Sequence, residues 1–136
     1  MFHKGLNKEV LIEASKELVE ENGIAAFSMR ALAEKLGVKT ASLYAHVASM
    51  DALFTEVGLS ALHDQKGAQL AAIEGKDGDA AVFALAESYR TFAKAHAALY
   101  QLIMQMPMGK DETLRAAAAM TAEPSMHCLL YTSDAA

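Results

Sequence analysis

The side chains best suited to chemistry with another molecule lie between positions 39 and 46 of this 136-residue chain. They are Lys39, Thr40, Ser42, Tyr44 and His46. Ammonium, hydroxyl and phenol groups can donate hydrogen bonds to phosphate oxygens, and a lysine also reaches guanine O6 and N7 in the major groove. The pattern predicts contacts with nucleic acid, with Lys39, Thr40 and Ser42 on base edges.

Two short helices joined by a tight turn must position these groups. Apolar side chains recur at helical spacing at Leu32, Ala33, Leu36, Leu43 and Val47. Between them, Gly37 supplies the positive φ that ends a helix, and Val38 fills the gap beneath the turn. This spacing predicts a helix-turn-helix, whose second helix enters the major groove. The alternative is an ordinary helical hairpin whose polar face meets only water.

The residues around this motif bring in a family. Residues 10–54 read VLIEASKELVEENGIAAFSMRALAEKLGVKTASLYAHVASMDALF and resemble the TetR family of bacterial transcriptional repressors. The matching positions are Ala14, Leu18, Gly23, Ser28, Arg30, Ala33, Gly37, Val38, Ser42, Leu43, Tyr44, His46, Val47 and Ser49. Further on, ESYRTFAKAHAALYQLIM resembles a ligand-domain subclass with a YRxFA…HPxLY pattern, with Ala97 in place of the usual proline.

The resemblance implies an all-α fold, in which a three-helix DNA-binding domain precedes a truncated helical ligand-binding and dimerisation domain. It implies that Tyr44 and His46 face DNA and that Arg30 reaches base or backbone. Ser28 and Ser49 cap helices, whose free N–H groups would hold phosphates. The implied partner is double-stranded DNA, a palindromic operator bound by a homodimer of the intact protein.

One departure from the family pattern concerns the start of the fourth helix. Met50 stands where relatives usually carry a lysine that contacts phosphate. Loss of that contact should make the salt dependence of DNA binding shallower by about one unit.

Composition and charge set further limits. The chain is 53 % hydrophobic with two prolines, which favours an all-α protein, and its one cysteine excludes an internal disulfide framework. No apolar run is long enough to cross a bilayer, so we expect a cytoplasmic protein without a membrane partner. The net charge of −5 is unusual for a DNA binder. Within the motif, however, only Glu34 opposes Arg30, Lys35 and Lys39.

Start and stop signals predict seven helices. Asn7, Ser28, Thr40 and Ser49 are the expected caps, and Gly23 ends the first helix at about residue 22. The expected later helices span about 49–73, 80–97 and 99–106, and a seventh begins after Asp111. GKDGD at residues 75–79 is the loop between the fourth and fifth helices, and the fifth carries Phe83, Tyr89 or Arg90, and Phe92 on successive turns.

These signals divide the chain into residues 1–50, the DNA-binding domain, residues 51–124, a partial ligand-binding domain, and residues 125–136, a non-native tail. The final CLLYTSDAA reads like translated adapter DNA from sequencing libraries, the alternative being a natural frayed terminus. On the adapter interpretation, the helices that dimerise relatives are missing from this chain.

The second half predicts a soft apolar pocket for a small hydrophobic effector whose identity the sequence does not give. The candidate ligand contacts are His63, Phe92, His96, Tyr100 and Met104. The alternative is that the apolar ones fill the core and the histidines are structural. Methionines without a neighbouring cysteine are weak evidence for a copper site, so we expect no metal and no cofactor.

The sequence contains no Ser–His–Asp, paired-carboxylate, phosphate-loop or zinc-spacing pattern, so we expect no catalytic residues and no enzyme. We expect a sequence-specific DNA-binding regulator, a repressor released by a small hydrophobic ligand. A helical protein-interaction module without DNA binding is the alternative, but it does not explain the turn and the second helix of the motif.

Overall fold

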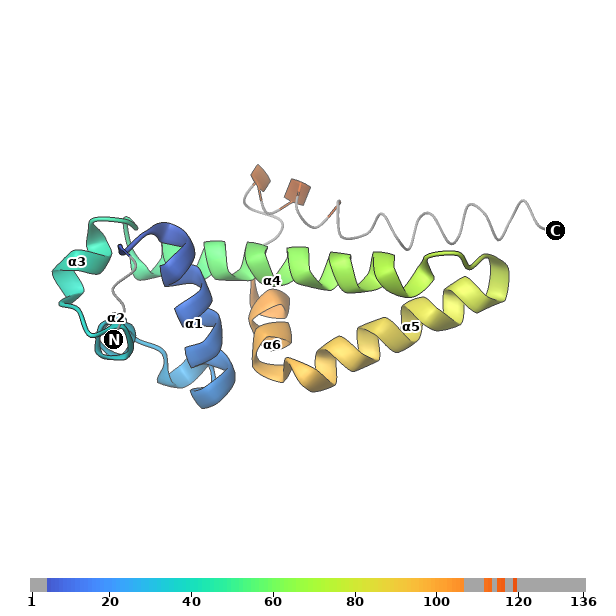
Figure 1. Ribbon diagram of the computed structural model, residues 1–136, viewed down its shortest axis with the longest axis horizontal. Coiled ribbons are helices and arrows are strands. Elements are labelled where there is room, and N and C mark those ends of the chain that lie inside the picture. Colours follow the sequence, from blue (N-terminus) through green and yellow to red (C-terminus); the bar gives the residue numbers. More distant parts are fainter. Residues whose placement is uncertain (1–4, 107–111, 114, 117–118, 120–136) are drawn as a thin grey trace. The chain divides into compact units, whose positions relative to one another are not determined.

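The computed structural model describes residues 5–106, 112–113, 115–116 and 119, and all regular structure within them is helical. The expected seventh helix lies largely, and the tail at 125–136 wholly, outside these residues. Contacts divide the described residues, whose helices are drawn as ribbons in Figure 1, into two compact units, the first ending at Ser60 and the second beginning at Ala61. This division falls inside a helix whose first turns supply buried residues such as Leu53 and Val57. The domain bounds expected from the sequence stay a prediction.

The first unit begins with α1 (Lys8–Asn22), the short 3-10 helix η1 (Ile24–Ala26) and α2 (Met29–Leu36). The Asn7 side chain caps α1 by accepting a hydrogen bond from the Val10 N–H at 2.9 Å, as predicted. Gly23 ends α1 with a φ of 82°, and its N–H donates to the Val19 carbonyl. Ser28 caps α2 through its Oγ, which accepts from the Ala31 N–H at 3.0 Å. Both predicted caps are confirmed.

The turn after α2 is a Schellman motif. Gly37 adopts the left-handed region at φ 67°, ψ 32°, as its place in the sequence predicts. Its N–H donates to the Glu34 carbonyl, and the Val38 N–H donates to the Ala33 carbonyl at 3.0 Å. These bonds satisfy two carbonyls at the end of α2 and direct the chain into α3 (Thr40–Tyr44).

The prediction that Thr40 caps α3 is wrong. Lys39 has the extended backbone of the cap residue, so the helix begins one residue earlier and Thr40 is its first helical residue. No side chain caps this helix. The next helix, α4 (Met50–Ile73), is capped as predicted, since the Ser49 Oγ accepts from the Ala52 N–H at 3.0 Å.

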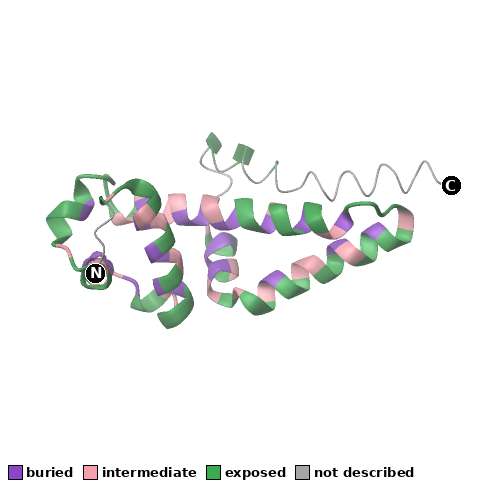
Figure 2. Ribbon diagram, viewed as in Figure 1, coloured by how far each residue is buried: buried purple, intermediate pink, exposed green. Residues whose placement is uncertain are grey.

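The core of the first unit contains one fully buried leucine from each of its four α-helices. Leu11, Leu32, Leu43 and Leu53 come from four different helices and are fully buried. Phe27, just before α2, packs its ring against Phe54 of α4 at a centroid distance of 4.7 Å. Leu43 is the one residue of α3 that is buried in this core, so the rest of that helix lies at the surface (Figure 2).

The second unit contains the rest of α4, α5 (Gly78–Ala95) and α6 (Ala97–Gln105). Gly75 and Gly78 have φ of 70° and 54° in the turn that reverses the chain between α4 and α5. Helices α5 and α6 each begin two residues before the predicted positions.

The apolar stripe of α5 also differs from the predicted one. Ala81 and Leu85 of α5 pack on Ile73 of α4, whereas Phe83 is 73 % exposed. Residues two apart on a helix point to nearly opposite sides, so Phe83 cannot share the face of Ala81 and Leu85. Phe92 is buried, because it lies seven residues, or about two turns, after Leu85 on the same stripe.

Candidate nucleic-acid interface

Helix α3 is polar and exposed except for one buried apolar side chain. Leu43 is fully buried, and Val47, one turn later, is 7 % exposed. The carbonyl of Leu43 accepts hydrogen bonds from the N–H groups of His46 and Val47, which extends the turn beyond the helix. Tyr44 keeps 51 % of its surface exposed, although it is a large aromatic residue. An exposed aromatic beside a buried anchor is available for contact with another molecule.

The predicted contact residues of α3 and its flanks lie together and are exposed: Lys39, Thr40, Ser42, Tyr44 and His46. Within the described part of the chain, none of these side chains is engaged in a hydrogen bond or ion pair. The structure thus groups one ammonium, two hydroxyls, a phenol and an imidazole on a short surface formed by α3 and its two ends. Such a set can donate to both phosphates and base edges.

Arg30 is the second exposed cation of the motif. It lies in the first turn of α2, and its side chain is 87 % exposed. Its Nε is 3.4 Å from the Glu34 Oε1, one helical turn away. A pair this exposed is weak, so a phosphate can compete for the guanidinium. Glu34 nevertheless places an opposing charge beside it.

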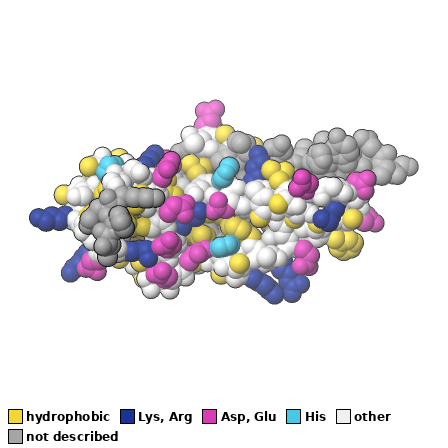
Figure 3. All heavy atoms as spheres, in the orientation of Figure 1, with side chains coloured by type: hydrophobic (Ala, Val, Ile, Leu, Met, Phe, Trp, Pro, Cys, Tyr) yellow, Lys and Arg dark blue, Asp and Glu magenta, His cyan; other side chains and the backbone are white. Residues whose placement is uncertain are grey.

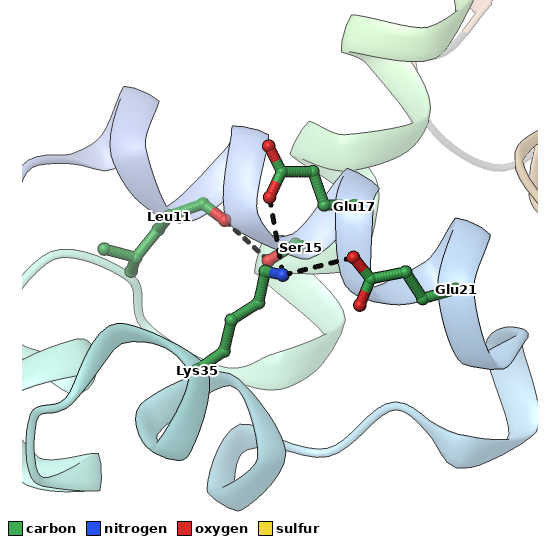
Figure 4. A network of polar contacts seen from close by, with 5 residues as sticks. All are labelled: Leu11, Ser15, Glu17, Glu21 and Lys35. Atoms are coloured by element: carbon green, nitrogen blue, oxygen red, sulfur yellow. Dashed lines mark hydrogen bonds and ion pairs between the residues drawn. The ribbon is translucent and has the colours of Figure 1, made fainter.

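Lys35 joins two helices of the domain and does not belong to the contact surface. Its Nζ lies 3.4 Å from the Glu17 Oε2 and 3.5 Å from the Glu21 Oε1, both on α1 (Figure 4). Its side chain is only 25 % exposed. The lysine therefore ties α2 to α1, and its charge is shared with two carboxylates of α1. Arg30 and Lys39 remain as the available cations of the motif.

The two capping serines keep their helix starts at the surface. Ser28 is half-buried and Ser49 is exposed, and each Oγ accepts a backbone N–H of its own helix. A phosphate contact at either helix start stays a prediction. Met50, the first residue of α4, is half-buried and provides no charge there.

Charge over the rest of the described surface is mixed. Figure 3 shows basic and acidic side chains interspersed, without a broad area of one sign on the drawn face. Several cations are paired, including Lys8, whose Nζ lies 2.9 Å from the Glu56 Oε1. Contact with a polyanion would therefore depend on the few cations near α3 rather than on a general positive field.

The second unit contains an open groove of about 610 Å³. Half of its ten lining residues are alanines, and the other half are larger or polar: Ala68, Ala71, Ala72, Ala84, Glu87, Ser88, Thr91, Phe92, Ala95 and His96. Of the predicted ligand contacts, Phe92 and His96 line this groove and pack ring against ring at 5.0 Å. His63, Tyr100 and Met104 do not line it, and Met104 is 67 % exposed.

Sequence reasoning missed two polar residues inside the second unit. Gln65 and Gln69 are 3 % and 0 % exposed, and they continue the buried stripe of α4 between Ala61 and Ile73. Their four-residue spacing from these apolar neighbours was a signal that both would face inward. Among the described residues, no three His, Cys, Asp or Glu side chains gather as a metal site would require. No helix in that same part of the chain is long and apolar enough to span a membrane.

Comparison with known proteins assigns the first unit. Residues 11–57 match the family described as bacterial regulatory proteins, tetR family. These residues run from α1 through α3 into α4 and include the exposed group around α3. The first unit is a TetR-family DNA-binding domain. The all-helical fold predicted from the sequence is confirmed.

Curated relatives agree with this TetR-family assignment. A helix-turn-helix transcriptional regulator of Mycobacterium tuberculosis is 31 % identical over 107 residues, which are 79 % of this chain and 49 % of the relative. A regulator of the same type from Bacillus subtilis is 30 % identical over 71 % of this chain and 51 % of its own length. The class D tetracycline repressor protein of Escherichia coli is 44 % identical over 63 residues, or 28 % of its length. The chain thus spans about half the length of the first two relatives.

Solved structures share the fold over most of the chain. A protein of unknown function from a Rhodococcus species has a TM-score of 0.84 and 25 % identity, covering 98 % of this chain and 71 % of the other. The TetR-family regulator PfmR from Thermus thermophilus has a TM-score of 0.70 and 23 % identity, covering 91 % of this chain and 70 % of its own. At this identity the second likeness supports the fold alone.

Proposed function

We propose that the protein to which this chain belongs is a sequence-specific DNA-binding transcriptional regulator, and that its intact form binds a palindromic operator as a homodimer. We further propose that it represses transcription until a small, mostly apolar effector bound in the second unit releases it. The observation that carries the proposal is the exposed group on α3, where Lys39, Thr40, Ser42 and Tyr44 have no partner among the described residues. The TetR-type domain to which α3 belongs supports it.

The side chains of α3 and its flanks would contact two different parts of DNA, the base edges and the phosphates. Lys39, Thr40 and Ser42 lie at the start of α3, where side chains of a recognition helix contact base edges. Tyr44 lies at its end and would place its phenol on a phosphate, which positions the helix without reading sequence. Arg30 would add a second contact from α2 once its weak pair with Glu34 opens.

Release would depend on α4. This helix is continuous from Met50, directly after its Ser49 cap, to Ile73 in the second unit. A ligand that shifts α4 would move the two recognition helices of a dimer away from the spacing of about 34–36 Å that matches one turn of DNA. Such control requires the ligand to bind the DNA-competent and released states with different affinity.

The first experiment is selection of binding sites from a random duplex library at low salt with the intact protein. We expect an enriched palindrome, and failure of any sequence to enrich would contradict DNA recognition. Fluorescence anisotropy of the selected duplex, measured against a panel of small apolar compounds, tests release. If no compound lowers the anisotropy, ligand control is refuted while DNA recognition stands.

A further inference from the structure

One side chain of the second unit is enclosed without a hydrogen-bond partner. Gln69 of α4 is 0 % exposed, and neither its Nε2 nor its Oε1 has a hydrogen-bond partner among the described residues. These two are the enclosed, unpaired side-chain atoms found in the described residues. An amide that is buried without hydrogen bonds costs free energy, whereas a methionine or leucine of similar size would not carry that cost. A partner from outside the chain would remove it.

The position of Gln69 puts this amide next to the groove. Ala68 and Ala72 of α4 line the groove and end at Cβ, so they leave space beside the helix. At about 100° per residue, Ala72 lies about 60° from Gln69 around the helix axis. Gln69 is not itself one of the lining residues, and Ala71, which is, lies about 160° away around the helix, so Gln69 adjoins the groove only on the side of Ala72. Phe92 and His96 come from α5 and its end and provide the aromatic part of the same groove.

We propose that Gln69 is the hydrogen-bonding group of a ligand site that takes a neutral, mostly apolar molecule bearing a carboxamide or lactam. An amide on the ligand can donate to the Gln69 Oε1 and accept from its Nε2 at the same time, which satisfies both atoms. No charged side chain is buried in the described residues of this unit, and Glu87 at the groove carries the one formal charge of its lining, so an anionic ligand would find no counter-charge. This inference rests on the proposed effector site and names the ligand class for it.

A series of three naphthalenes tests the inference on the full chain without DNA. 2-Naphthamide has donor and acceptor, 2-acetonaphthone keeps the acceptor alone, and 2-isopropylnaphthalene has neither. Calorimetry should rank them in that order for the unaltered protein, with a step of about tenfold for each hydrogen bond lost. Gln69→Met should weaken 2-naphthamide by at least about tenfold and leave 2-isopropylnaphthalene unchanged or tighter. Gln101→Met, the same change at an exposed position of α6, is the control.

The stability of the ligand-free protein provides a second readout. Gln69→Met should raise the unfolding midpoint, because it removes an unpaired buried amide. If the methionine variant fails to fold, Gln69→Leu replaces it in both measurements. The proposal is overturned if 2-naphthamide does not bind, if it binds the Gln69 variant as well as the unaltered protein, or if both Gln69→Met and Gln69→Leu are less stable than the unaltered protein. A failure here leaves site selection on DNA unaffected, so it is distinguishable from failure of the proposed function.

Discussion

The turn that presents α3 depends on one backbone conformation, and Gly37→Ala tests it. Gly37 lies in the left-handed region at φ 67°, ψ 32°, and a Cβ built there meets nothing within 4 Å. The substitution therefore introduces backbone strain without a steric clash. Gly67 is the matched control, since it lies in the middle of α4 without a positive φ and its Cβ would also meet nothing within 4 Å.

The two substitutions should have opposite signs. A left-handed conformation costs a residue with a Cβ about 1–2 kcal/mol, and the lower entropy of the unfolded chain returns about 0.4–1 kcal/mol. Gly37→Ala should therefore lower the free energy of unfolding of the first unit by roughly 1 kcal/mol. Gly67→Ala should raise that of the second unit by about 0.8–1 kcal/mol, because alanine is the better helix former. Gly37→Asn should fall between glycine and alanine, since asparagine tolerates the left-handed region.

Urea and thermal unfolding followed by circular dichroism measure these effects. For a domain of about 60–100 residues, 1 kcal/mol corresponds to a midpoint shift of about 4–8 °C. The denaturant slope should stay constant, which assigns the change to stability rather than to compactness. Gly37→Ala with unchanged or increased stability would refute the role given to this turn.

Three further substitutions test the first unit. Ser28→Ala removes the cap of α2 and should lower the free energy of unfolding by about 1 kcal/mol in urea titrations; an unchanged midpoint would show that the cap contributes nothing. Glu34→Gln removes the acid beside Arg30 and should raise affinity for a random duplex about twofold to threefold at low salt, an effect lost at high salt and absent in Glu87→Gln. Met50→Lys should steepen the salt dependence of duplex binding by about one unit, measured as log affinity against log salt, and an unchanged slope would exclude a phosphate at the start of α4.

The parts of the fold that the sequence could predict are those that depend on interactions between residues close together in the chain. The Asn7, Ser28 and Ser49 caps and the Gly37 turn each follow from a side chain or a φ angle that acts on the next three or four backbone groups. The cap of α3 could not be predicted in this way. Its start is set by the turn before it, which leaves Lys39 extended, and this outweighs the capping preference of Thr40.

The features that sequence reasoning missed are decided by packing between helices. Lys35 lies in the motif, but its charge is used by Glu17 and Glu21 of α1, fourteen or more residues earlier in the chain. Phe83 is an apolar residue, but it points outward because the buried stripe of α5 runs through Ala81 and Leu85. Gln69 was overlooked because a polar residue type suggests a surface position, although its spacing matched that of the buried residues.

The central claim is that α3 reads DNA with its first residues and holds the backbone with Tyr44. The decisive measurement is the affinity of Tyr44→Ala and Lys39→Ala for the selected duplex and for its single-base variants, with Arg90→Ala as the control. Arg90 is an exposed cation of the second unit, so its loss matches the charge change of Lys39→Ala. Tyr44→Ala should weaken all duplexes equally, whereas Lys39→Ala should erase about 1–3 kcal/mol of discrimination at particular base pairs. If both variants bind every duplex as the unaltered protein does, α3 is not the recognition helix.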